Sequence, residues 1–180
     1  MISKILIPTD GSKAAQKAAM RAIDLAKQLK ASVFVLSVID KHVLTVLQEM
    51  PVSDSTVVKT MFSLGTAKNA MKTIYEHMHD AAERRAIEIK KLCEKNKLQS
   101  KIVITTGHPA EEILKVAEKL KVDLIVMGSH GRSSLVAAVL GSVAYGVIHQ
   151  DTKIPVMVVR IEKKARKVVG DTKNVSAIFA

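Results

Sequence analysis

The sequence is poor in cysteine and in aromatic residues: among 180 residues it has one cysteine, no tryptophan, three phenylalanines and two tyrosines. With so few aromatic rings, the hydrophobic core must be aliphatic. A single cysteine excludes a disulfide within the chain and favours a reducing compartment. Cys93 falls in an apolar helical pattern with Ile89 and Leu92, so we interpret it as a small core residue rather than as a reactive thiol.

Long hydrophobic runs are also lacking. The longest uncharged stretch covers 133–150, and its apolar part of about 14 residues is shorter than the roughly 20 that a membrane span requires. The first residues lead directly into an apolar strand and show no cleavable signal pattern. We therefore expect a cytoplasmic protein without a membrane partner.

The net charge of +11 permits nucleic acid, anionic lipid or a polyphosphate as a partner. Basic residues outnumber acidic ones in the segment 161–180, which we interpret as a basic C-terminal tail. The aromatic residues that would form a base-stacking platform are missing from it. A solvated basic surface is therefore favoured, and nucleic acid is an unlikely partner.

Apolar runs alternate with amphipathic helical patterns along the chain. Strands are predicted over 4–8, 32–38, 101–106, 122–127 and 155–159. Helices are predicted from the Thr9–Ser12 cap cluster to about 29, then over 66–96, over 109–120 and from the glycine segment to about 150. Strands that are apolar on both faces indicate an α/β fold with a parallel sheet covered by helices on both sides. We expect one domain over 1–160, with an irregular insertion at 41–65 that has a possible short helix at 43–50.

Two predicted loops carry chemistry. Ligands of doubly wound sheets bind beyond the carboxyl ends of the strands, where the strand order reverses. The loop after the first strand contains Asp10, and the loop after the fourth contains Gly128-Ser129-His130-Gly131. These loops would face each other across a cleft if strands one and four were neighbours, which the residues alone leave open.

The glycine segment suggests phosphate binding. Backbone N–H groups cradle phosphate oxygens, and glycine permits the close approach that this needs. Gly141 and Ser142 stand at the start of a predicted helix, where Ser142 can serve as the N-cap and the free amides form an anion site. Other nucleotide motifs are absent, since the chain has neither GxxxxGK[ST] nor GxGxxG after its first strand.

Taken together, several segments resemble the universal stress protein family, in its ATP-binding branch. They are Ile5–Ser12, Gly107–Ala110, Asp123–Gly131, Gly141–Ala144 and Pro155–Val159. The resemblance covers about 1–160, apart from the insertion. It implies a doubly wound five-stranded parallel sheet of order 3-2-1-4-5, with the first and fourth strands adjacent, and a homodimer often paired through the last strand.

The same resemblance implies a binding site for ATP, accompanied by Mg²⁺ or Mn²⁺. Asp10 would lie near the ribose or the metal ion, and the backbone of Val38 would meet the adenine. The nucleoside would be lined by Met127 and Gly128, with Pro8 and Thr9 completing the wall. Around the phosphates would lie Gly131, Arg132, Gly141, Ser142 and Val143.

Single residues keep alternative interpretations. Asp10 could also cap the helix that begins near Ser12, and both roles can coexist. Arg132 could be a solvated loop cation. His130 could act as a base, although a loop role is favoured because no partner for it is identifiable. His77 and His79 point to different helix faces, which argues against a metal site there.

Three functions remain open. The first is a regulatory module in which ATP fixes the loop from Gly128 to Ser142, and with it a dimer conformation that an unknown protein partner reads. The second is a slow ATPase or autokinase with a metal held by Asp10. The third is an adaptor that binds no nucleotide and uses the basic tail to contact a protein or nucleic acid.

Overall fold

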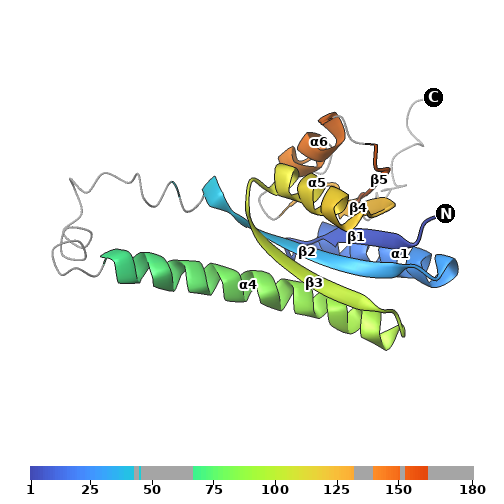
Figure 1. Ribbon diagram of the computed structural model, residues 1–180, viewed down its shortest axis with the longest axis horizontal. Coiled ribbons are helices and arrows are strands. Elements are labelled where there is room, and N and C mark those ends of the chain that lie inside the picture. Colours follow the sequence, from blue (N-terminus) through green and yellow to red (C-terminus); the bar gives the residue numbers. More distant parts are fainter. Residues whose placement is uncertain (43–44, 46–66, 132–139, 151–152, 162–180) are drawn as a thin grey trace, which may run out of the picture.

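A five-stranded parallel sheet organises the chain. We describe residues 1–42, 45, 67–131, 140–150 and 153–161 of a computed structural model. The strands are β1 (Lys4–Pro8), β2 (Ser32–Asp40), β3 (Ser100–Gly107), β4 (Leu124–Gly128) and β5 (Val156–Val159) (Figure 1). Their spatial order is β3-β2-β1-β4-β5. The predicted fold class and strand order are therefore confirmed.

The first and fourth strands are neighbours, which the residues alone had left open. Ile5 pairs with Leu124 and Leu6 with Ile125 in parallel register. Because both strands point the same way, their carboxyl ends meet at one edge of the sheet, and the two loops of interest follow from that edge. The topological switch point of the fold therefore lies between Asp10 and Gly128.

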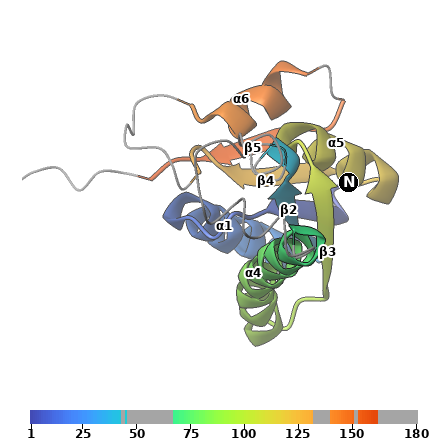
Figure 2. The same ribbon diagram turned by 90° about the vertical axis from the view of Figure 1, so that its left-hand side faces the viewer.

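Four helices cover the sheet within the described residues, two on each face (Figure 2). α1 (Lys13–Leu29) and α4 (Ala67–Lys95) lie on one face, and α5 (Pro109–Leu120) and α6 (Ser142–His149) lie on the other. Small residues bring α1 close to the strands, since Ala18, Ala22 and Ala26 are fully buried. Each face has its own aliphatic core cluster.

The long helix α4 packs against β2 and β3 through its second half. Ala82, Ala86, Ile89 and Cys93 are buried there. The exposed fraction of Cys93 is 0%, and burial raises the pKa of its thiol above the ordinary value. This confirms the interpretation of Cys93 as a core residue, because a thiol that resists ionisation is a poor nucleophile.

Most of the predicted insertion at 41–65 and the tail at 161–180, including the possible helix at 43–50, lie outside the described residues. β1 has the predicted bounds, and the other strands differ from the prediction by one or two residues at one end or both. β2 continues to Asp40 because β3 keeps pairing with it, Asp40 lying opposite Gly107. None of the helices in the described part of the chain is long and apolar enough to cross a membrane.

The Asp123 carboxylate ties the start of β1 to the start of β4. Its Oδ2 accepts hydrogen bonds from the Ser3 N–H at 2.8 Å, the Ser3 hydroxyl at 2.9 Å and the Lys4 N–H at 2.9 Å. Donation from the Ser3 N–H, with the Ser3 hydroxyl and the Lys4 N–H, lowers the pKa of Asp123. The carboxylate that directly precedes β4 thus fixes the alignment of β4 with β1.

Replacing Asp123 with asparagine should therefore remove a stabilisation that depends on pH. A carboxylate whose pKa is lowered by folding stabilises the protein fully above its unfolded pKa, near 4, and loses this effect as the pH falls through the folded pKa. At pH 7 we expect D123N to lower the free energy of unfolding by about 1 kcal/mol, because Asp123 is only half-buried and solvent screens its interactions. Urea unfolding between pH 2 and 7 measures this. The difference in the free energy of unfolding between D123N and wild type should vanish at the acid end. D24N, which changes an exposed carboxylate of α1, is the control and should show no such dependence on pH. A difference that stays constant with pH would contradict the role given to the Asp123 carboxylate.

Candidate functional site

A cleft of ≈ 790 Å³ lies beyond the carboxyl ends of β1 and β4. The predicted site residues described by the structure all line it: Pro8, Thr9, Asp10, Val38, Met127, Gly128, Gly131, Gly141, Ser142 and Val143. Arg132 lies outside the described residues. Segments that are more than a hundred residues apart in the sequence thus meet in one concave site, as expected of a ligand site at a switch point.

The turn after β1 is held by short local hydrogen bonds. The Thr9 N–H donates to the Leu36 carbonyl at 2.8 Å, which continues the pairing of β1 with β2 for one residue. The Ser12 N–H then donates to Oδ1 of Asp10 at 3.0 Å, and the Ala15 N–H donates to the Ser12 hydroxyl at 3.1 Å. Ser12, not Asp10, is therefore the N-cap of α1, and the alternative interpretation of Asp10 as that cap is wrong. Asp10 instead orients Ser12.

The two glycine segments lie against each other. The Gly141 N–H donates to the Ser129 carbonyl at 2.8 Å. A Cβ on Gly141 would come within 3.2 Å of the His130 Cα and of the same carbonyl oxygen. On the other side, a Cβ on Gly131 would lie 3.0 Å from Oδ2 of Asp10. The glycine segments and the Asp10 carboxylate therefore form one continuous wall.

The N-terminus of α6 opens into this wall. Gly141 is the N-cap, and its carbonyl accepts the Tyr145 N–H at 2.8 Å, so Ser142 is the first helical residue. The prediction of Ser142 as the N-cap is wrong by one residue, because Gly141 already has the extended backbone that a cap adopts. Among the residues that the structure describes, no side-chain hydrogen bond caps the N-terminus of α6. The amides of the first turn, from Ser142 to Ala144, thus have no helical acceptor and lie at the cleft, where an anion can bind them.

Another part of the cleft lining forms an apolar wall. Val38 and Leu36 from β2, Met127 from β4 and Ile113 from α5 line it, with Pro109 at the start of α5. Leu36, Met127 and Ile113 are buried, and Val38 is half-buried. Such a surface suits a flat, largely apolar ring, while the amide-rich wall suits an anion.

Sequence reasoning missed two charged residues of the cleft, Asp40 at the end of β2 and Arg85 of α4. For Arg85 a signal existed. Residues 82, 85, 86 and 89 recur at helical spacing, so Arg85 lies on the same side of α4 as its buried residues. Without this comparison with the spacing of the buried residues, the pair Arg84-Arg85 is easily interpreted as part of a solvated charged face.

Ser129 and His130 contact each other at the base of the glycine segment. The Ser129 hydroxyl and Nδ1 of His130 are 2.7 Å apart, and Ser129 is fully buried. A buried hydroxyl is inaccessible to a substrate, so the pair orients the imidazole rather than exposing a nucleophile. His130 Nε2 is buried and has no hydrogen-bond partner within the described part of the chain. This geometry agrees with the loop role that the sequence favoured for His130.

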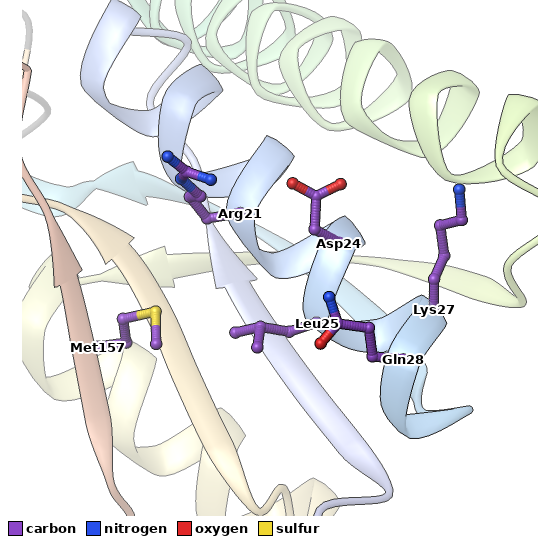
Figure 3. Close-up of a pocket in the computed structure, with 6 residues that line it drawn as sticks. All are labelled: Arg21, Asp24, Leu25, Lys27, Gln28 and Met157. Carbon is purple, nitrogen blue, oxygen red and sulfur yellow. The ribbon is translucent and has the colours of Figure 1, made fainter.

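Two other features lie outside the cleft. A shallower pocket of ≈ 390 Å³ opens between the second half of α1 and β5, where Leu25 and Met157 face each other under a rim of charged side chains (Figure 3). On α4, ligand atoms of His79, Asp80 and Glu83 lie within 4.8 Å of one another. These side chains are largely exposed on one helix, an arrangement that is common without any bound ion.

Comparisons with known proteins agree with this architecture. The family model described as "Universal stress protein family" matches residues 1–160. Universal stress protein MJ0531 of Methanocaldococcus jannaschii is 34% identical over 91% of this chain and 85% of its own length. Universal stress protein MJ0577 of the same organism is 32% identical over 89% of this chain and 96% of its own. A solved structure of MJ0577 has a TM-score of 0.72, covering 91% of this chain and 99% of that one at 31% identity.

A solved universal stress protein in complex with cAMP has a TM-score of 0.52 and 21% identity, over 88% of this chain and 97% of its own. At this identity the likeness concerns the fold alone.

Proposed function

The chain belongs to the universal stress protein family, and from this membership we propose that it is a regulatory protein that captures ATP in the cleft between β1 and β4. The observation that carries the proposal is the pairing of two unlike walls in one cleft. The lining of the cleft includes both an apolar wall and a wall of backbone amides. Those are the two surfaces that a purine base and a chain of phosphates need.

The amide wall supplies the binding energy for phosphate. Each contact of an anion with the N-terminus of a helix contributes about 0.3–1 kcal/mol when exposed and up to about 2 kcal/mol when sheltered. A micromolar ligand needs about 8 kcal/mol. The first turn of α6 and the 128–131 segment must therefore act together with burial of the base at Val38 and Met127.

Charge in the cleft supports a divalent cation as a companion of the nucleotide. The charged residues of the described lining are two carboxylates, Asp10 and Asp40, and one guanidinium, Arg85. A polyphosphate would be repelled by this set unless a cation intervened. We place Mg²⁺ or Mn²⁺ at Asp10, since hard oxygen ligands and phosphate oxygens together suit such ions.

The complex of a universal stress protein with cAMP lends support, because it places a purine nucleotide on this fold. We propose capture rather than rapid turnover, since Ser129 is buried and its contact with His130 serves the loop. Captured ATP would then fix the glycine wall and a conformation that a protein partner reads.

The proposed functional unit is a homodimer. β5 is one of the two edge strands of the sheet, and an edge strand presents unpaired N–H and C=O groups that a second copy can pair with. Met157 of β5 and the adjoining Ile161 are 38% and 43% exposed. Apolar side chains on an edge strand are suited to burial between two copies.

Isothermal titration of the pure protein with ATP and Mg²⁺ tests the proposal. We expect a dissociation constant on the order of micromolar, about −8 kcal/mol. Binding of GTP should be weaker, because guanine would bring more polar edge groups than adenine against the apolar wall around Val38. Sedimentation velocity with and without ATP measures whether loading changes the assembly. Absence of binding up to millimolar nucleotide would reject the capture of ATP, and a monomer under both conditions would reject the dimeric switch.

A further inference from the structure

We propose that Arg85 of α4 binds the phosphate chain of the nucleotide and gives the cleft its preference for polyphosphates over adenosine and AMP. The inference rests on the proposed capture of ATP and adds a residue from outside the glycine segments. It concerns the only cation of the described cleft lining.

Contact with Gly11 holds the stem of Arg85 in place. α1 and α4 cover the same face of the sheet (Figure 2), and Gly11, just before α1, lies beside Arg85 of α4. A Cβ on Gly11 would come 3.0 Å from the Arg85 Cγ, 3.1 Å from its Cδ and 3.6 Å from its Nε. Gly11 has φ = +80°, a conformation that favours glycine. The turn after β1 therefore leaves a seat for the aliphatic part of Arg85.

This seat places Arg85 at the phosphate side of the cleft. Gly11 follows Asp10, whose Oδ2 lies 3.0 Å from the position of a Gly131 Cβ. Gly131, Asp10 and Arg85 all line the cleft. Asp10 approaches Gly131, and the residue after it, Gly11, contacts the stem of Arg85. Val38 and Met127, which form the apolar wall, lie on β2 and β4 within the sheet. Arg85 therefore belongs to the polar part of the lining.

The chemistry of arginine suits this position. A guanidinium stays charged at any physiological pH and donates paired N–H groups to phosphate oxygens in a planar fork. Arg85 is half-buried, and its stem is already packed on Gly11, so less side-chain entropy is lost when a ligand binds. Asp10 and Asp40 carry the opposite charge into the cleft. Each added phosphate gives the ligand more negative charge, so the attraction between Arg85 and the ligand should grow with the number of phosphates.

A purely structural role for Arg85 makes a different prediction. If the guanidinium only oriented the carboxylates of the cleft, its loss would weaken adenosine and ATP alike, or neither. If it binds phosphate, its loss changes the ratio of the two affinities. The decisive quantity is therefore the ratio of dissociation constants across ligands, which a general loss of folding does not alter selectively.

Isothermal titration of the full chain with adenosine, AMP, ADP and ATP, each in excess Mg²⁺, measures this ratio. For R85Q we expect ATP affinity to fall roughly tenfold or more and adenosine affinity to change less than about twofold. R85K should recover part of the loss, because a point charge remains without the fork. R84Q is the matched control, since Arg84 is the exposed neighbour on α4 and is not part of the cleft. It removes the same charge from the protein and should leave all four affinities unchanged.

The outcomes separate this inference from the proposed function. Wild-type binding of ATP together with an unchanged ATP affinity in R85Q would overturn the role of Arg85 and leave the capture of ATP intact. An equal loss for adenosine and ATP, or an equal loss in R84Q, would also overturn it. Failure of wild type to bind any of the four ligands would reject both. Protection of α4 amides around 80–90 from hydrogen exchange by ATP, seen in wild type and absent in R85Q, would support the contact independently.

Discussion

Alanine at Gly128 will destabilise the protein by about 1–3 kcal/mol or more and will abolish nucleotide binding. A Cβ at this position would lie 2.7 Å from the carbonyl carbon of Ala14, 2.9 Å from its Cβ and 2.9 Å from the Ala15 nitrogen. Two of these atoms belong to the backbone of α1, which cannot move aside as the end of a flexible side chain can. Accommodating the methyl group requires α1 to shift away from β4, which opens the core beneath Ala18 and Ala22. Urea unfolding followed by circular dichroism measures the loss.

G131A is the control for this prediction. Gly131 is exposed, and the atom that its Cβ would approach is Oδ2 of Asp10, at 3.0 Å. Rotation of the Asp10 side chain can move this oxygen by a few tenths of an ångström. G131A should therefore keep its stability within about 0.5 kcal/mol, while the added methyl group changes the wall formed by the glycine segments and Asp10. Equal stabilities of G128A and G131A would show that the close approach of α1 to Gly128 is not a constraint on folding.

Gly128 illustrates what sequence could and could not predict. The spacing of the glycines predicted a phosphate site, and the resemblance predicted which strands bring the glycines to Asp10. The structure adds that Gly128 is needed for the packing of β4 against α1. That requirement depends on a distance between two segments more than a hundred residues apart, and no local pattern contains such a distance.

The elements themselves were predictable because their periodicities are strong. Alanines at helical spacing predicted the buried face of α1, and continuous apolar runs predicted strands covered on both faces. Smaller features were decided by backbone geometry. Ser142 has a better capping side chain than Gly141, yet Gly141 takes the cap because the chain is extended there and its N–H is bonded to Ser129.

Arg85 was missed for a related reason. Its helical phase placed it on the inner side of α4, but a charged residue at the edge of a buried face ordinarily reaches solvent. The turn after β1, with Gly11 at positive φ, packs against the stem of Arg85, and Arg85 lines the cleft. The residue pattern therefore predicts helix α4, whereas the place of Arg85 in the cleft depends on a tertiary contact.

Asparagine at Asp10 should remove the dependence of ATP affinity on Mg²⁺ while leaving the fold intact. The Asp10 Oδ1 accepts the Ser12 N–H, and an asparagine carbonyl can accept the same hydrogen bond. The substitution therefore keeps the turn that supports the Ser12 cap and removes only the charge. Loss of one charged ligand should weaken Mg²⁺-dependent ATP binding by about 1.5–3 kcal/mol, or roughly 10- to 100-fold in Kd. Titrations with ATP in EDTA and in excess Mg²⁺ measure the difference for each variant.

The chain provides a closely matched control in Asp40. This carboxylate also lines the cleft, and its Oδ1 accepts the His42 N–H at 2.9 Å. Asp10 accepts the Ser12 N–H in the same way, so in both cases the donor lies two residues after the aspartate. D40N thus removes one negative charge from the same cleft with the same local geometry. If the metal ion lies at Asp10, D40N keeps the full enhancement by Mg²⁺ and D10N loses it. If both variants lose it equally, the cation responds to the total charge of the cleft, and Asp10 has no specific place in its coordination.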